Sequence, residues 1–181
     1  SANITLKKKL LFKKKNILIV GGGLSVKKNI TYIKEFLKKK PDIFIIFSSN
    51  RNFELLQNIK NNYIICIVGN EFTKINTASK KNRKIKFLIN DIIDDKTILP
   101  KNLGKFFQLK KNKIEKKLSN SPLSVALSAA SELEGKNIYL VGFDGYEQIN
   151  KINDYSLYNE NQQIVDFYKK KLNLISLNET T

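Results

Sequence analysis

The chain has 181 residues, and its 33 Lys and Arg against 16 Asp and Glu give a formal net charge of +17. Its length fits a single domain, and its one cysteine and absence of histidine exclude an internal disulfide, Ser-His or Cys-His nucleophilic pairs and most zinc sites. No apolar run reaches the length of a membrane span, so we expect a cytoplasmic protein with no membrane span.

The chain begins Ser1-Ala2-Asn3 and contains no methionine, so we interpret it as the C-terminal part of a longer chain. Residues 1–15 are rich in lysine, and we expect a linker or a tag remnant there. No repeat or linker divides residues 16–181, which we expect to form one domain.

The first predicted element is a buried strand over 17–20, a continuous aliphatic run typical of parallel sheets. Gly21, Gly22 and Gly23 follow it and allow a sharp turn with bare N–H groups. Ser25 is expected to cap a helix over 26–38. Free N–H groups and the helix dipole favour an anion, so this turn is a candidate phosphate site.

The glycine turn differs from two known phosphate-binding signatures. Val26 stands where the dinucleotide fingerprint has its third glycine, and no Gly-Lys-Ser/Thr follows as in a P-loop. The acidic residue expected after the next strand is replaced by Ser48-Ser49-Asn50. The turn is therefore either a nucleotide site or a tight strand-to-helix connection without a ligand.

A second buried strand is predicted over 43–47, after Pro41 ends the first helix. Ser48, Ser49 and Asn50 follow at the carboxyl end of that strand, which is the ligand crevice in a doubly wound sheet. Arg51 suits a bidentate contact with phosphate or carboxylate. Alternatively, Ser49 or Asn50 caps a short helix over 52–60.

Further strands are predicted over 63–68 and 86–91, with a short one at 106–107. Asn70 follows the first of these strands, and Cys66 within it is expected to be a buried core residue. Asp91 ends the second strand, where a carboxylate either binds Mg²⁺ beside a phosphate or is simply an exposed loop acid.

The last third of the chain repeats the arrangement of strand, glycine and polar group. Ser121 is expected to cap a helix that starts at Pro122 and ends at Gly135, before a strand over 138–141. Asp144, in the following Gly-Phe-Asp-Gly-Tyr turn, suits a ribose, a base or a metal ion, and Tyr146 suits stacking on a base or sugar. The alternative is an ordinary Asp-Gly turn with the tyrosine packed over it.

The remaining residues are predicted as a polar loop over 147–158, a helix over 159–171 and a last strand over 172–177. Strands and helices thus alternate along the whole domain, and the strands are almost continuously apolar. This order predicts an α/β fold, a Rossmann-like three-layer sandwich with a mainly parallel sheet of about five to six strands.

The positive charge does not by itself indicate a nucleic-acid partner. The lysines are spread along the chain, and lysine, asparagine and isoleucine are enriched together, as in proteins from AT-rich genomes. Arginine, the usual reader of bases, occurs only at Arg51 and Arg83. We expect a solvated lysine-rich surface with no specific nucleic-acid binding and salt-sensitive attraction to polyanions.

Three stretches together resemble a known Rossmann-like group: Ile19-Val-Gly-Gly-Gly-Leu-Ser25, Ser48-Ser-Asn50, and Asn120-Ser121 through Tyr146. The group includes bacterial sialyltransferases, flagellar motility accessory factors and archaeal pterin pyrophosphokinases, which share a Gly-x-Gly-Pro-Ser turn and a strand ending Gly-x-Asp. Within this group the chain resembles the C-terminal domain behind an aldolase-like barrel of the hydroxymethylglutaryl-lyase superfamily, found in surface-polysaccharide gene clusters.

This resemblance implies nucleotide phosphates near Gly21–Ser25 and a nucleoside near Asp144. It also implies an upstream aldolase-like domain of the hydroxy-oxovalerate aldolase type, a lyase whose divalent metal lies in that domain, with no metal or cofactor in this one. Leu24 replaces the proline of the group's turn, and the histidine base of the sialyltransferases is absent, so their transfer chemistry is not supported.

We therefore expect a nucleotide- or nucleotide-sugar-binding domain attached to an aldolase-like enzyme of bacterial surface-glycan biosynthesis, with no catalytic residue assigned. The alternative is a glycosyl- or pyrophosphoryl-transferase in its own right, with Asp144 or Asp91 as base or Mg²⁺ ligand. The candidate binding residues are Gly21, Gly22, Gly23, Ser25, Ser48, Ser49, Asn50, Asn70, Ser121, Asp144 and Tyr146.

Overall fold

The structure is a computed structural model that describes residues 15–68, 87–89, 106–109, 114, 117–144 and 152–177. Its strands are β1 (Ile17–Val20), β2 (Phe44–Phe47), β3 (Tyr63–Ile67), β4 (Phe87–Ile89), β5 (Phe106–Gln108), β6 (Ile138–Val141) and β7 (Leu174–Ser176). Its helices are α2 (Ser25–Lys28), α3 (Ile30–Lys39), the 3₁₀ helix η1 (Glu54–Leu56), α5 (Pro122–Glu132) and α6 (Ile152–Tyr168).

The described strands form one seven-stranded sheet in the order β5-β4-β3-β2-β1-β6-β7, and every neighbouring pair is parallel. The predicted α/β class and Rossmann-like three-layer architecture are confirmed. The sheet exceeds the expected five to six strands because the short segments β5 and β7 both pair, one at each edge.

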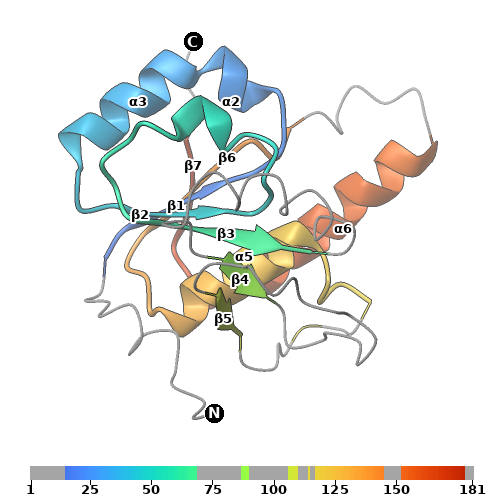
Figure 1. Ribbon diagram of the computed structural model, residues 1–181. Coiled ribbons are helices and arrows are strands. Elements are labelled where there is room, and N and C mark those ends of the chain that lie inside the picture. The colour runs from blue at the N-terminus through green and yellow to red at the C-terminus, as the bar shows by residue number, and fades with distance from the viewer. Residues whose placement is uncertain are drawn as a thin grey trace.

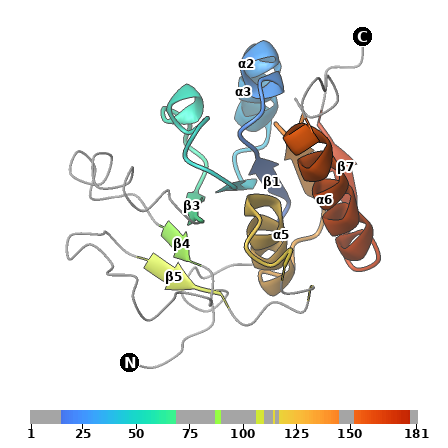
Figure 2. The ribbon, with the colours of Figure 1, turned by 90° about the vertical axis from the view of Figure 1, so that its right-hand side faces the viewer.

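Helices cover both faces of the sheet, as Figures 1 and 2 show. Alternate residues of a strand point to opposite faces, so Leu18 and Val20 join an apolar cluster with residues of α2, α3 and η1. Ile17 and Ile19 join the other cluster, with residues of α5 and α6. The strands are thus buried on both faces, which explains their unbroken apolar sequences.

Cys66 is fully buried in the cluster that faces α5 and α6, as predicted. Tyr63 lies at the amino end of β3, with its ring 5.2 Å from that of Phe53 and 5.9 Å from that of Phe47. Burial raises the pKa of its hydroxyl.

Several element boundaries differ from the prediction. The helix expected over 26–38 is two helices, because the backbone leaves helical angles at Asn29 (φ −103°, ψ 18°), between α2 and α3. The helix expected over 52–60 is only the single turn η1. The predicted loop over 147–158 is wrong in part, because α6 already begins at Ile152. The last strand is limited to Leu174–Ser176.

The chain order creates a switch point between β1 and β6. From β1 the strands are added in one direction as far as β5, and α5 then returns the chain to β6 on the other side of β1. Ligands of open α/β sheets usually bind beyond the carboxyl ends of the strands at such a point. Three turns meet there: residues 21–25 after β1, 48–51 after β2 and 142–144 after β6.

In the part of the chain that the structure describes, no helix is both long enough and apolar enough to cross a bilayer.

Candidate functional site

The turns after β1 and β6 are joined by direct hydrogen bonds. The Gly21 amide donates to the Val141 carbonyl (2.8 Å), and the Gly23 amide donates to the Gly142 carbonyl (2.7 Å). These two amides are therefore engaged, which corrects the expectation that the whole glycine turn presents bare N–H groups. Gly21 and Gly23 thus connect the turn after β1 to the turn after β6, and we call this contact the joint between β1 and β6.

Asp144 reaches the same turn from the end of β6. Its Oδ2 accepts from the Ser25 amide (2.9 Å), and its Oδ1 accepts from the Ser25 hydroxyl. The carboxylate is thus an internal anion at the start of α2, where the positive end of the helix favours negative charge. The predicted capping role of Ser25 is wrong, because Leu24 is the N-cap residue and the Ser25 hydroxyl binds Asp144 instead.

Close packing explains why glycine is required at this joint. A Cβ on Gly21 would overlap the Gly142 carbonyl oxygen, and one on Gly23 would lie 2.7 Å from the same oxygen. Gly142 has a φ of +83°, and a Cβ there would lie 2.8 Å from the Gly21 carbonyl oxygen. Both turns therefore depend on glycine for their mutual approach.

Gly22 differs from its two neighbours. A Cβ on Gly22 would meet only side chains, with Ser49 Oγ at 3.3 Å and Arg51 Cδ at 3.4 Å. Its amide has no hydrogen-bond partner among the described residues. Gly22 therefore faces the end of β2 rather than the end of β6.

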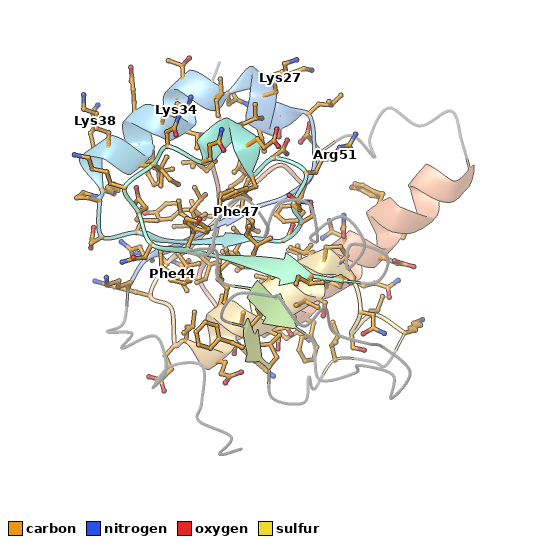
Figure 3. All side chains as sticks on the ribbon, viewed as in Figure 1. Lys27, Lys34, Lys38, Phe44, Phe47 and Arg51 are labelled. Atoms are coloured by element: carbon orange, nitrogen blue, oxygen red, sulfur yellow. The ribbon has the colours of Figure 1, made fainter. Side chains whose placement is uncertain are left out.

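The surface between the ends of β1 and β2, made of Gly22, Leu24, Ser49, Asn50 and Arg51, is called the β1–β2 patch. The Leu24 side chain is 61% exposed, which is unusual for leucine, and the exposed Arg51 donates its amide to Ser49 Oγ (3.3 Å). Figure 3 shows Arg51 on the same side of the molecule as Lys27 of α2. The patch combines an open amide, a guanidinium, a hydroxyl and an apolar side chain.

Asn52 attaches the glycine turn to the end of β2, and this role was not predicted from the sequence. Its Nδ2 donates to the Gly21 carbonyl (2.7 Å) and to the Gly23 carbonyl (3.0 Å), and the residue is 8% exposed. It is one of several asparagines in a polar stretch, so no local pattern distinguishes it. Only the packing of the β2 end against the β1 end reveals its role.

The other candidate residues have different positions. Ser48 is buried, and its amide and hydroxyl both donate to the Val20 carbonyl, at 2.9 and 3.3 Å. Ser121 is the N-cap residue of α5 as predicted, but its side chain makes no capping hydrogen bond. No hydrogen bond joins Ser121 to the glycine turn within the described ranges. Asn70, Asp91 and Tyr146 lie outside the described residues.

The titrating groups with perturbed pKa values are not residues of the β1–β2 patch. Tyr63 is at the opposite, amino end of its strand, and Asp166 is on α6, where the hydrogen bond from Lys169 is the main cause that lowers the Asp166 pKa. Among the described residues, no three His, Cys, Asp or Glu side chains are grouped closely enough to hold a metal ion.

No family model matches this sequence, and a search of curated proteins finds no match either.

Proposed function

We propose that the domain binds a nucleotide or nucleotide-sugar at the β1–β2 patch, with a phosphate between the Gly22 amide and the Arg51 side chain. The observation that carries this proposal is the placement of Gly22, whose amide has no hydrogen-bond partner among the described residues, next to the Arg51 side chain at the carboxyl edge of a doubly wound sheet. A guanidinium binds phosphate in a bidentate manner, and an amide adds a charge-assisted hydrogen bond.

The Asp144 carboxylate determines on which side of β1 the phosphate is expected. Asp144 already neutralises the start of α2 through Ser25, and a phosphate placed there would meet a like charge. We therefore place the phosphate toward β2, which revises the sequence-based expectation of the whole turn from Gly21 to Ser25. Leu24, exposed beside it, supplies apolar surface for a base or sugar.

The contacts of Asp144 favour a binding role over a transferase role that would use this residue. In a transferase, Asp144 would need a carboxylate oxygen available to act as base or metal ligand. Both of its oxygens accept hydrogen bonds from Ser25. Attachment to an aldolase-like lyase of surface-glycan synthesis remains part of the proposal and rests on the sequence resemblance alone.

Thermal unfolding with CMP-, UDP- and GDP-sugars tests the proposal. At least one of them is expected to raise the Tm, because a ligand at a hundredfold excess over its Kd stabilises a protein by about 2.7 kcal/mol. Arg51→Gln is expected to weaken that ligand by roughly tenfold or more, since hydrogen bonds to charged groups contribute about 1.5–3 kcal/mol.

Lys27→Gln is the matched control, because it removes one exposed charge from α2 on the same side of the molecule. It is expected to change the affinity less than about twofold, as for most surface charges. Absence of any thermal shift at millimolar nucleotide, or equal losses in the two variants, would contradict the proposed site.

A further inference from the structure

A cavity lies at the amino edge of the sheet, opposite the edge that carries the β1–β2 patch. It has a volume of about 450 Å³, and its walls come from the second half of α3 and from the segment between η1 and β3. Pro41 lines it shortly before β2 begins, and Lys60 lines it shortly before β3 begins. The cavity is thus separated from the β1–β2 patch by the length of the strands.

The cavity has an apolar floor and a basic rim. Leu37, which is 1% exposed, and the half-buried Ile59 contribute apolar surface. Lys34, Lys38 and Lys60 also line the cavity and are exposed, and none of the residues that line it is acidic. Its volume lies within the roughly 300–1,000 Å³ of typical ligand sites, which are mostly apolar with a few polar groups.

The presence of three lysines around one cavity is not explained by the needs of the fold. Lys38 is in the last turn of α3, where a cation complements the helix dipole. Lys39 shares that turn, and Lys40 follows it and lies over the Phe36 ring (5.3 Å). Other cations therefore already complement the negative end of the helix, and Lys38 is not needed for this purpose. Lys60 comes from a different segment, and no ion pair involving Lys34, Lys38 or Lys60 occurs within the described ranges.

Lys34 and Lys38 are one helical turn apart and share a face of α3. Figure 3 shows both on this helix, toward the end of the molecule that lies away from Arg51. Their long alkyl stems can lie along the apolar floor while their ammonium groups stay at the rim. The cavity is therefore suited to a molecule that is apolar at one end and negatively charged at the other.

We propose that this cavity binds an amphipathic anion, a molecule with an apolar body and a carboxylate or sulfonate head. The body contacts Leu37, Pro41 and Ile59, and the head pairs with Lys34, Lys38 and Lys60. This site does not depend on the nucleotide site, because no residue is common to both.

The fluorescence of anilinonaphthalene sulfonate bound to the full chain, and its displacement by decanoate, test this inference. The triple variant Lys34→Gln, Lys38→Gln, Lys60→Gln is compared with Lys27→Gln, Lys28→Gln, Lys39→Gln, which loses the same charge outside the cavity. All six lysines are exposed, so both variants should fold, as unchanged melting curves would verify.

The cavity variant is expected to bind the dye roughly tenfold more weakly than the control variant, since three exposed ion pairs are lost together. Decanoate should displace the dye, and decyltrimethylammonium at the same concentration should not. Equal weakening in the two variants, displacement by the cation, or no dye binding by the folded chain would overturn the inference. Competition by a nucleotide-sugar would also overturn it, because the two sites would then be one.

Discussion

Gly21→Ala is expected to destabilise the domain by about 2–3 kcal/mol, the upper range for forcing an extra methyl group into a packed site. The added Cβ would overlap the Gly142 carbonyl oxygen and lie 2.9 Å from Cε1 of Phe143. The overlapped oxygen belongs to the backbone of the neighbouring turn, so the strain cannot be relieved by rotating a side chain. Urea unfolding followed by circular dichroism measures the loss.

Gly22→Ala is the matched control in the same turn. Its Cβ would meet only the side chains of Ser49 and Arg51, at 3.3 Å or more. Both residues follow the carboxyl end of β2. Its unfolding free energy should therefore change by less than about 0.5 kcal/mol, as for surface substitutions. Equal stability of the two alanine variants would show that the joint between β1 and β6 is not as described.

Asn52→Asp is expected to cost about 3 kcal/mol, the scale of leaving a buried charge uncompensated. The substitution keeps the shape of the side chain but replaces its amide donor with a second oxygen. That oxygen would face the Gly21 and Gly23 carbonyls, which now accept from Nδ2 at 2.7 and 3.0 Å. Two acceptors would lose their donor, and the glycine turn would lose its attachment to the end of β2.

The pH dependence of this variant identifies the mechanism. Burial and the two facing carbonyls would raise the pKa of the new carboxyl above its ordinary value. The variant should therefore approach the wild-type stability as the pH falls and the carboxyl is protonated, and lose stability as the pH rises. Asn62→Asp, at an exposed position just before β3, is the control and should be nearly neutral. A pH-independent loss would argue for a packing defect instead.

The fold could be predicted from the sequence because its strands are buried on both faces. Runs such as Ile17–Val20 and Phe44–Phe47 are continuously apolar and are followed by glycine or small polar residues. Such runs are typical of parallel sheets. The break between α2 and α3 could not be predicted in this way, because Asn29, where the backbone leaves helical angles (φ −103°, ψ 18°), is neither glycine nor proline.

The location of the candidate site followed from a simple rule, but its internal geometry did not. Parallel strands place their carboxyl ends at one edge, so the turns after β1, β2 and β6 were expected to meet. The pairing of Asp144 with Ser25 joins residues 119 positions apart, and the bonds of Asn52 to Gly21 and Gly23 span 31 and 29 positions. Neither leaves a local sequence pattern.

An amide NMR titration of the chain with CMP-, UDP- and GDP-sugars tests whether a nucleotide binds at the β1–β2 patch. We expect the largest shifts at Gly22, Ser49 and Arg51, and no response from Lys60 and Asn61 at the amino edge. Shifts confined to the amino edge, or none at any site with millimolar nucleotide, would contradict this expectation.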